Sequence, residues 1–464
     1  MKYEVMHASF SVWWQWILGI LACLLLVSGI DDLLPLLICL RHRMPGRRMP
    51  DDDGELCVIE RRIAIFVPCW QESQVIGEMV RQNAARIRYR NYDMFIGVYP
   101  NDQATCDAAF DAAASLPNIH VCVSDRPGPT SKADCLNSIY LGMQSCERAS
   151  CIRFDTIVLH DAEDVIHAEA LNVLNLYRRK YAMVQIPVLP LPTGPGELTH
   201  GIYCDEFAEF QLIDMLARQY SGSFVPSNGV GTGFARNVLE TLAVQRGGLL
   251  FDASSLTEDY DIGLQIHYAG FAQTFFPVRA RKRRFIATRE FFPRKWRSAI
   301  RQRTRWITGI ALQSWERHGW RGSWGTRYWF WRDRKGLITN PLSLLTNLFF
   351  LVGVTDWMIA QITHRPWSFS VTSAPVLELC CATTALQVLH ISVRALCVTR
   401  VFGFGMGATV PLRCFHANFV NCAASLNALK NYIRAKSGGQ SLRWDKTDHA
   451  YPTAVAPTVS EAVD

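Results

Sequence analysis

Three carboxylates crowd one short segment, His160-Asp161-Ala162-Glu163-Asp164, which directly follows an apolar β-branched run. Such crowding raises the pKa values of carboxyl groups by mutual repulsion unless a cation lies among them. Hard carboxylate oxygens suit magnesium or manganese, and such an ion can neutralise a diphosphate leaving group. The segment therefore favours a site for Mg²⁺ or Mn²⁺ over a solvated acidic turn. His160 and His167 leave a metallohydrolase as a further alternative.

A second acidic pair, Glu258-Asp259, follows Thr257 at the expected start of a helix. Acidic residues in a first helical turn are stabilised by the helix dipole and need no function to explain them. A general base that activates an acceptor hydroxyl, however, needs a carboxylate such as Asp259 facing a ligand crevice. Both interpretations stay open on these residues alone.

Two glycine-containing loops could bring the backbone close to a ligand. Pro127-Gly128-Pro129-Thr130-Ser131 leads into a helix with Lys132 in its first turn. A cation there opposes the helix dipole, so an anion is expected to compensate it; a solvated lysine beside a capping Ser or Thr is the alternative. The second loop, Asn228–Gly233, does not complete a dinucleotide-binding fingerprint, and the first lacks the spacing of a Walker loop.

Further polar residues follow expected strands or share a helical face. Glu72 comes just after the first strand and Asp102 just after the second, where a base or ribose could be hydrogen-bonded, although the helix dipole alone would favour both. Gln302, Arg305 and Trp306 lie at i, i+3 and i+4, so one face offers an amide, a phosphate-binding fork and a stacking surface. Anchoring at a membrane interface would explain the same face.

Apart from Gln302, Arg305 and Trp306, these residues fall in a region of alternating strands and helices between Leu56 and about Val278. Strand then helix, repeated, predicts an α/β fold with a mostly parallel sheet and a ligand crevice at the carboxyl ends of the strands. The predicted strands are Arg62–Val67, Met94–Tyr99, Ile119–Val123, Thr156–His160 and Met183–Leu189, and the clearest helices are Gln74–Tyr89, Thr105–Ser115 and Lys132–Gln144.

Three apolar stretches are long enough to cross a membrane as helices. Ala8–Ile30 carries no charge, while Leu337–Thr363 contains Asp356 and Pro366–Val393 contains Glu378. The basic residues that flank them assign the region between the first and second stretches to the cytoplasm. The two acidic residues either mark a water-filled path or reach the interface.

The segments around these stretches carry many cations. Arg281–Lys335 combines 17 Lys or Arg residues with seven Trp, which is typical of a membrane interface; because it abuts a spanning helix, we do not expect nucleic-acid binding. Ala408–Ile433 has bases on both sides, which predicts an interfacial or re-entrant helix. The tail Ser437–Asp464 is expected to be loosely ordered.

The overall composition excludes other classes of protein. Of 464 residues, 49% are hydrophobic and 19% charged, which rules out a disordered or collagen-like chain, and the formal charge of +7 is a mild excess. The 15 cysteines contain no C-x-x-C pair and many have apolar neighbours. We therefore expect reduced thiols rather than disulfides or a zinc site.

Taken in order, these motifs resemble those of membrane-bound family 2 glycosyltransferases, which include cellulose and hyaluronan synthases. Thr257-Glu258-Asp259 and Gln302-Arg303-Thr304-Arg305-Trp306 match the TED and QxxRW motifs of that family. The resemblance covers about residues 8 to 436. Ile30-Asp31-Asp32 and Arg443-Trp444-Asp445-Lys446-Thr447 look most like the glycosyltransferase part of the family's phage-adsorption members.

The resemblance implies a GT-A fold with transmembrane helices and inverting transfer from a nucleoside-diphosphate sugar, with a UDP-sugar as the expected donor. The acceptor would be a growing glycan or a lipid-linked molecule. The metal motif has Glu163 where these synthases usually have Asp. By position, Glu72, Asp102, Lys132 and Asp161 would bind the nucleotide, Glu163 and Asp164 the metal, and Gln302, Arg305 and Trp306 the diphosphate and acceptor, while Asp259 beside Glu258 would be the catalytic base.

We therefore expect a processive, multi-pass enzyme of the bacterial inner membrane, in contact with membrane lipids, that makes and exports an exopolysaccharide. A single-addition transferase and a non-catalytic receptor or scaffold are the alternatives. The phage-adsorption members often carry a carboxyl-terminal domain that binds cyclic di-GMP. Since this chain stops at Asp464, a separate subunit would have to bind cyclic di-GMP or assist export.

Overall fold

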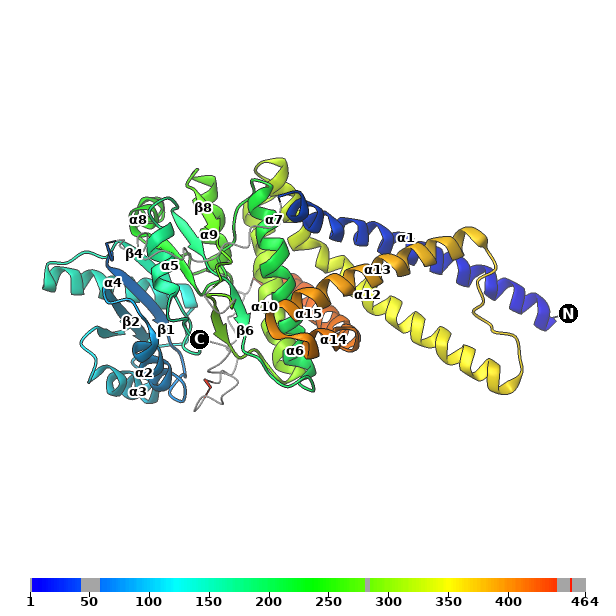
Figure 1. The fold of residues 1–464 in the computed structure, drawn as a ribbon, viewed down its shortest axis with the longest axis horizontal. Helices are drawn as coiled ribbons and strands as arrows, with labels where there is room; N and C mark the ends of the chain where they lie inside the picture. The colour runs from blue at the N-terminus through cyan, green and yellow to red at the C-terminus, as the bar shows by residue number, and fades with distance from the viewer. Residues whose placement is uncertain (1, 43–58, 280–283, 440–450, 453–464) are drawn as a thin grey trace.

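A seven-stranded sheet with the order β3-β2-β1-β4-β7-β5-β8 forms the centre of the α/β part of the chain (Figure 1). The computed structural model describes residues 2–42, 59–279, 284–439 and 451–452. The strands of this sheet are β1 (Ile63–Pro68), β2 (Tyr92–Val98), β3 (Ile119–Val123), β4 (Thr156–Leu159), β5 (Met183–Gln185), β7 (Thr232–Ala235) and β8 (Gln273–Phe275).

The sheet is mostly parallel, as the alternating pattern predicts. β1 pairs in parallel with both β2 and β4, β2 with β3, and β5 with β8, whereas β7 runs antiparallel to β4 and β5. The carboxyl ends of β1, β2 and β4 therefore meet at one edge. The loops that follow Pro68, Val98 and Leu159 share that edge, which is where a parallel sheet places its ligand crevice.

Both faces of the sheet are covered by helices, which explains why the strands read as continuous apolar runs. Along β1, Ala64 and Phe66 pack with the apolar side of α4 (Lys132–Ser150). Ile63 and Ile65 point to the other face and pack with three helices. These are α2 (Ile76–Arg86), α3 (Gln103–Ala113) and α5 (Ala170–Tyr177).

The predicted strand Met183–Leu189 is two strands in two different sheets. β5 ends at Gln185, and β6 (Val188–Pro190) pairs in parallel with β9 (Thr288–Glu290) in a separate two-stranded sheet. The change occurs at Pro187, which has no N–H to donate to a strand ladder. Its carbonyl instead accepts from Thr288 N at 2.9 Å, so this proline directs the chain into the second sheet.

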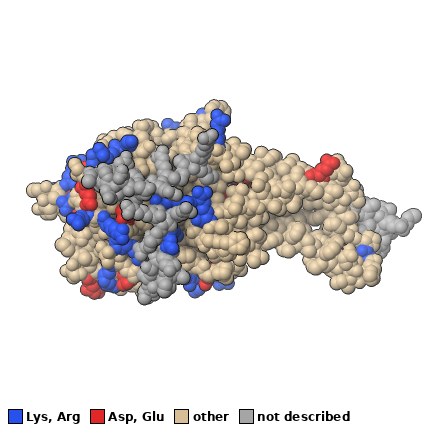
Figure 2. Space-filling view, viewed as in Figure 1, with Lys and Arg blue, Asp and Glu red and all other residues tan. Residues whose placement is uncertain are grey.

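Within the described residues, three helices are long and apolar enough to cross a membrane: α1 (Lys2–Arg41), through its part Trp13–Arg41, α12 (Trp324–Thr363) and α13 (Ala374–Phe402). They extend together away from the α/β part (Figure 1). On the face in Figure 2, Lys and Arg gather over the α/β part, while the extending helices carry few charges. Membrane character is thus a property of this half of the molecule.

Asp356, one of the two acidic residues in the predicted membrane-spanning stretches, makes polar contacts in the turn between α12 and α13. Asp356 forms an ion pair with Arg365, and its Oδ2 accepts from Ser368 N at 3.0 Å. The predicted second helix, from Pro366, begins only at Ala374 because residues 366–373 form this turn. Asp356 thus supports the turn, whereas Glu378 is exposed on α13.

Among the remaining helices, α15 joins the two halves. α15 packs against α10, α12 and α6 and is not among the candidate spans of the described chain, in line with an interfacial helix. Residues 440–450 and 453–464, including the Arg443–Thr447 motif, lie outside the described residues. The helices are α6 (Leu198–Glu209), η1 (Phe210–Asp214), α7 (Met215–Tyr220), α8 (Arg236–Val244), α9 (Glu258–Tyr268), α10 (Trp296–Ile307), η2 (Thr308–Gln313), α11 (Ser314–His318), α14 (Phe404–Ala408) and α15 (Val410–Gly438), with η marking π-helices.

Candidate active site

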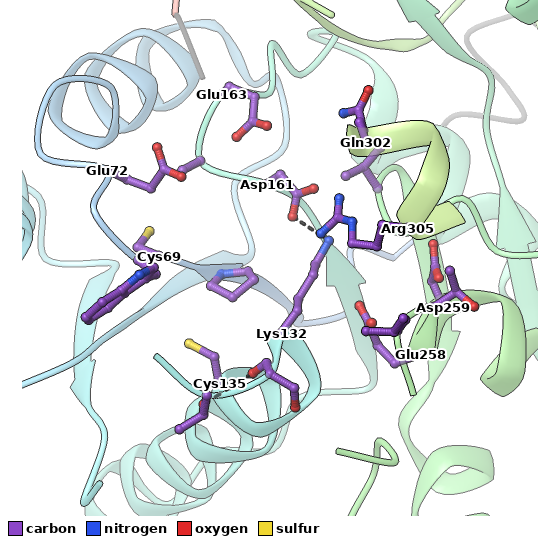
Figure 3. Close-up of a pocket in the computed structure, with 18 of the residues that line it drawn as sticks. Cys69, Glu72, Lys132, Cys135, Asp161, Glu163, Glu258, Asp259, Gln302 and Arg305 are labelled. Atoms are coloured by element: carbon purple, nitrogen blue, oxygen red, sulfur yellow. Dashed lines mark hydrogen bonds and ion pairs between the residues drawn. The ribbon is translucent and has the colours of Figure 1, made fainter. Parts of the chain in front are cut away.

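A cavity of about 120 Å³ opens at the carboxyl edge of β1 and β4, where the sheet predicts a ligand crevice (Figure 3). Segments far apart in the chain contribute its walls: the loop after β1, the start of α4, the turn after β4, the start of α9 and one face of α10. The residues singled out from the sequence that line it are Glu72, Lys132, Asp161, Glu163, Glu258, Asp259, Gln302, Arg305 and Trp306.

Lys132 and Asp161 form the central ion pair of the cavity, with 2.5 Å between Nζ and Oδ1. Lys132 begins α4, and Ser131 caps that helix by accepting from Asp134 N. Burial alone would lower the pKa of the Lys132 ammonium, but the charges of Asp161, Glu258 and Asp259 outweigh burial and raise it. The lysine therefore stays charged, and Asp161 is the anion that compensates a cation at this helix start.

Glu258 and Asp259 enter the cavity from the first turn of α9 (Figure 3). Burial, followed by the neighbouring charge of Asp259, raises the pKa of Glu258 to about 7. Burial also raises the pKa of Asp259, although the nearby Lys132 ammonium opposes the rise. A carboxylate with a raised pKa is a stronger base near neutral pH, which suits proton abstraction.

The loop of Gly229 closes directly over Asp259. Gly229 has a φ of +75°, and a Cβ built there would lie 2.7 Å from Asp259 Oδ2 and 3.5 Å from Lys132 Nζ. The positive φ favours glycine, and a Cβ at this position would force the Asp259 side chain to move. The glycine-rich run Asn228–Gly233 thus approaches the acidic pair of α9, and Asn228 itself lines the cavity.

Two expected ligand-binding residues, Asp102 and Asp164, are turned away from the cavity. Asp102 accepts from Gln71 N at 2.5 Å and caps α3. Asp164 is fully buried, with Oδ2 2.7 Å from His160 Nδ1 and 3.0 Å from Asp161 N. Each carboxylate fixes the backbone beside a residue that does line the cavity. Neither side chain lines the cavity, so the structure does not bring these two expected ligands together with the other predicted site residues.

His160 and His167 do not form a shared metal-binding face. His160 is bound to Asp164 in the interior, and His167 Nδ1 accepts from Glu169 N at 3.1 Å. Neither lines the cavity. This arrangement removes the geometric basis for the metallohydrolase alternative.

Glu290, at the end of β9, is an acidic residue that lines the cavity and that the sequence motifs do not predict. Burial raises its pKa well above the usual range, and the charges of Asp164, Glu163 and Asp161 add to the rise. The signal in the sequence is an acid at the end of the short apolar run Phe285–Thr288. β9 is so short, and so far along the chain from β4, that only the pairing of β6 with β9 reveals the contact.

The helix α10 presents Gln302, Arg305 and Trp306 to the cavity from one face, as their spacing predicts. Arg303 lies on another face and donates to Glu206 at 2.5 Å and to Asn421 at 2.7 Å. The π-helix η2 follows directly, and π-helical turns are frequent at functional sites. The three side chains singled out by their spacing thus share one wall of the cavity.

The donor atoms of the cavity fit a divalent metal ion that arrives with its substrate. Asp161, Glu163 and Glu290 offer hard carboxylate oxygens, although nowhere in residues 2–42, 59–279, 284–439 and 451–452 are three His, Cys, Asp or Glu grouped as ligands of one ion. Magnesium is commonly held by one or two carboxylates together with substrate phosphates. Such a partial ligand set is therefore the expected one.

The fold and this site define a nucleotide-sugar type of transferase architecture, the GT-A fold. Residues 61–309, more than half of the chain, match the sequence profile described as Glycosyltransferase like family 2. The chain belongs to the family 2 glycosyltransferases and is an enzyme of that class. The resemblance of its motifs to that family is thereby confirmed.

Individual relatives agree with this assignment. The chain is 34% identical over 488 aligned residues to "Bacteriophage adsorption protein B" of Escherichia coli strain K12, and equally to "Bacteriophage N4 adsorption protein B" of Escherichia coli O157:H7. Each alignment covers 97% of this chain and 65% of the relative, so the chain spans about two-thirds of their length. A solved mannosyltransferase of Pyrobaculum calidifontis, in complex with GDP-Man and Mn²⁺, has the same fold, with a TM-score of 0.50, 16% identity, and coverage of 87% of this chain and 99% of that one.

Proposed function

We propose that this protein transfers a sugar from a nucleoside-diphosphate donor to an acceptor hydroxyl at the cytoplasmic face of a bacterial inner membrane, and so extends an exopolysaccharide. The observation that carries the proposal is the convergence of Lys132, Asp161, Asp259 and Arg305 on one cavity. Two cations suit a diphosphate, and an acidic residue beside them suits deprotonation of an alcohol.

The donor would lie with its diphosphate between Lys132 and Arg305. The Lys132 ammonium is compensated by Asp161, which can exchange this contact for the ribose or the base once phosphate arrives. Glu72 lies behind it, 6% exposed, with its backbone N–H bound to Thr105 Oγ1 at 2.9 Å. These residues support binding of the nucleotide end of the donor, and Gln302 and Trp306 support the sugar and acceptor end.

Glu163, together with Asp161, would hold Mg²⁺ or Mn²⁺ at this site. When bound, the ion supplies positive charge that stabilises the departing diphosphate. The fold relative solved with Mn²⁺ and GDP-Man supports this choice of ion and of donor class. In this proposal Asp164 acts indirectly, because its contacts with His160 and with Asp161 N set the conformation of the turn that presents Glu163.

Asp259 would act as the base of a single inverting displacement. The acceptor oxygen attacks the anomeric carbon, the bond from that carbon to the diphosphate oxygen breaks, and the acceptor proton passes to the Asp259 carboxylate. Glu258 beside it raises the negative charge of the site, and the Gly229 backbone leaves room for Asp259 to face the acceptor. Lys132 and Arg305 stabilise the charge that develops on the leaving diphosphate.

The helices α1, α12 and α13 would anchor the catalytic part to the membrane and provide the route along which a growing glycan leaves. The relatives named for phage adsorption support a surface-related product, since a phage receptor pathway must reach the cell exterior. A separate export subunit or one that binds cyclic di-GMP would complete such an assembly.

The test uses inverted membrane vesicles that contain the full chain, a panel of nucleotide sugars, and Mn²⁺ or Mg²⁺ with EDTA as the metal-free arm. Released nucleoside diphosphate, product length and the anomeric configuration of the product are measured. The test variant is Asp259→Asn, in the cavity. Its matched control is Asp111→Asn, which changes an exposed acidic residue of α3 outside the cavity. We expect metal-dependent release, an inverted linkage and a long product, lost in Asp259→Asn and kept in Asp111→Asn. Single-sugar products or a retained linkage would contradict the proposal.

A further inference from the structure

The loop between α7 and β7 brings Asn228 into the wall of the active-site cavity, where no motif gives this residue a role. Its side-chain Nδ2 is buried and has no hydrogen-bond partner among the described residues. Buried polar atoms are nearly always hydrogen-bonded, so an unpartnered one in a cavity wall points to a ligand. Asn228 is therefore a candidate contact for part of the substrate.

The backbone of this loop is held by one buried amide, that of Gln185, which is 0% exposed. Gln185 Oε1 accepts from Asn228 N at 2.9 Å and from Thr232 Oγ1 at 2.5 Å. Its Nε2 donates to the carbonyl oxygens of Val230 at 3.0 Å and Gly231 at 3.3 Å. These bonds fix the loop without using the Asn228 side-chain Nδ2. That donor is thus placed before a ligand arrives, and no hydrogen bond of its own has to break.

The position of the loop relates Asn228 to the reacting end of the donor. A Cβ on Gly229, the next residue, would lie 2.7 Å from Asp259 Oδ2 and 3.5 Å from Lys132 Nζ. Under Proposed function, Asp259 takes the proton of the acceptor and Lys132 binds the diphosphate, so the anomeric carbon lies between them. The loop therefore borders the donor sugar rather than the nucleotide.

A second unpartnered amide atom lines the same cavity. Gln302 of α10 is 8% exposed, and its Oε1 has no hydrogen-bond partner in the part of the chain that the structure describes. Asn228 Nδ2 can donate to a hydroxyl oxygen, and Gln302 Oε1 can accept a hydroxyl hydrogen. A sugar hydroxyl both accepts and donates. Two neutral amides with these complementary groups suit the hydroxyls of a sugar better than a phosphate.

We propose that Asn228 is a specificity-determining residue for the donor sugar, and that its side-chain amide donates a hydrogen bond to one hydroxyl of the sugar ring. This role depends on the proposed function, since it requires a nucleoside-diphosphate sugar in the cavity. A sugar that lacks the hydroxyl leaves the amide unpaired, and an unpaired buried group is how a polar site rejects an analogue.

The test is calorimetric titration of the full chain in detergent with Mn²⁺ and without acceptor. The ligands are UDP-glucose, GDP-mannose, the monodeoxy sugar analogues of each, and UDP and GDP alone. The test variant is Asn228→Leu, which keeps the approximate size of the side chain and the backbone bond to Gln185 but removes the amide. Asn228→Ala repeats the comparison with a smaller side chain. Asn237→Leu, at an exposed asparagine of α8 outside the cavity, is the matched control, and thermal unfolding verifies that each variant folds.

We expect Asn228→Leu to bind the nucleotide sugar about tenfold more weakly than wild type, and the nucleoside diphosphate within about twofold of wild type. One monodeoxy donor should lose about as much affinity in the wild type and lose none further in Asn228→Leu, because both changes remove the same hydrogen bond. Asn237→Leu should bind all ligands as wild type does.

Equal weakening of nucleotide sugar and nucleoside diphosphate in Asn228→Leu and Asn228→Ala would indicate a purely structural role and overturn the proposal. Unchanged binding of the nucleotide sugar in the folded variants, or additive losses with every monodeoxy donor, would also overturn it. These outcomes leave the proposed function intact. If neither nucleotide sugar binds the wild type, the proposed function is contradicted, and this role of Asn228 with it.

Discussion

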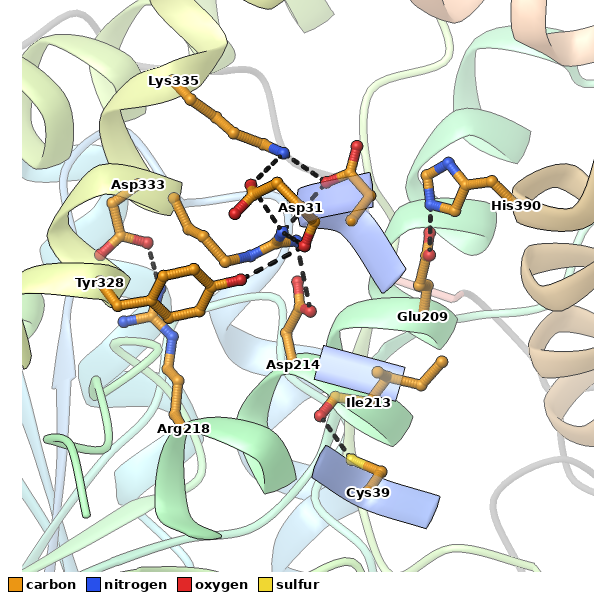
Figure 4. Close-up of polar contacts among 12 residues, drawn as sticks. Asp31, Cys39, Glu209, Ile213, Asp214, Arg218, Tyr328, Asp333, Lys335 and His390 are labelled. Atoms are coloured by element: carbon orange, nitrogen blue, oxygen red, sulfur yellow. Dashed lines mark hydrogen bonds and ion pairs between the residues drawn. The ribbon is translucent and has the colours of Figure 1, made fainter. Parts of the chain in front are cut away.

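The phenolic oxygen of Tyr260 donates a 2.7 Å hydrogen bond to Asp333, and this bond joins the helix of the proposed base to the long helix α12. Tyr260 directly follows Asp259 at the start of α9. Asp333 also pairs with Arg218 (Figure 4). The Arg218 guanidinium stacks over the Trp329 ring, 4.6 Å from its centroid. The position of the acidic pair is therefore set partly by a helix that is long and apolar enough to span a membrane.

Replacing Tyr260 with Phe removes this bond and keeps the ring in its buried site. We expect kcat to fall roughly 3- to 10-fold, since one hydrogen bond to a charged group contributes about 1.5–3 kcal/mol and part of that loss is offset by Arg218. The KM for donor should change little, because Lys132 and Asp161 are untouched. Steady-state release of nucleoside diphosphate measures both constants. Tyr268→Phe, on the outer end of the same helix, is the control, and an equal fall in both variants would argue against positioning by Asp333.

Gly229 offers a sharper test of the space around Asp259. Gly229→Ala places a methyl group 2.7 Å from Asp259 Oδ2, so we expect activity to fall about 10²-fold or more. Gly222→Ala is a matched control: its φ is +67°, yet nothing lies within 4 Å of the added Cβ. Both variants carry a similar backbone cost of about 1 kcal/mol, and chemical unfolding measures any further cost of the contact at Gly229. Near-normal activity of Gly229→Ala would show that Asp259 does not need this space.

The acidic pair predicts how activity depends on pH. Burial and the charge of Asp259 raise the pKa of Glu258 to about 7, and burial raises the pKa of Asp259 as well. The pair therefore takes up a proton as the pH falls through about 7, and kcat/KM should fall with it because the base must be ionised. In Glu258→Gln the acidic limb should move to lower pH, since Asp259 loses a negative neighbour. A limb that stays near pH 7 in this variant would assign the titration to another group.

Glu258 also predicts how the free energy of unfolding depends on pH. The pKa of Glu258 is higher in the folded chain than its ordinary value of 4.5, so the folded state binds the proton more tightly than the unfolded state. Glu258 therefore does not destabilise the folded chain below about pH 4.5, where its carboxyl group is protonated in both states. Its destabilising contribution to the free energy of unfolding grows between about pH 4.5 and about pH 7. Glu258→Gln should raise the free energy of unfolding at pH 8 and leave it nearly unchanged at pH 4. Urea unfolding at the two pH values measures the difference, and an equal effect at both would contradict the assignment.

The sequence predicts the strands well and the ends of the membrane helices poorly, for one physical reason. Apolar runs end where charges begin, so the first helix is predicted to stop at Ile30, whereas α1 continues to Arg41. Asp31 and Asp32 are paired with Arg332 and Lys335 of α12 at 2.5–3.3 Å (Figure 4). Charges that neutralise each other between two helices do not end either helix, and hydropathy along one segment does not reveal the partner.

Some residues of the candidate site can be predicted from the sequence and others cannot. Residue type and spacing are enough to predict that Lys132, Asp259 and one face of α10 line the cavity. Lys132 and Asp259 lie in the first turns of predicted helices, and the residues of α10 share a face by their spacing. Residue type and spacing do not predict the orientation of the Asp164 side chain, because it depends on a buried hydrogen bond to His160. Glu290 depends on the pairing of two three-residue strands that lie about 100 residues apart. Local patterns predict which elements meet, and the direction of a side chain depends on what packs beside it.

In the proposed mechanism, one cavity binds the donor diphosphate through Lys132 and removes the acceptor proton through Asp259. Calorimetric titration of the full chain with nucleoside diphosphate and Mn²⁺, run beside turnover for Lys132→Gln and Asp259→Asn, separates the two roles. We predict that Asp259→Asn binds nucleoside diphosphate as wild type does while turnover falls about 10²–10⁴-fold, and that Lys132→Gln loses binding at least tenfold. Loss of nucleotide binding in Asp259→Asn, or full turnover in either variant, would contradict the claim.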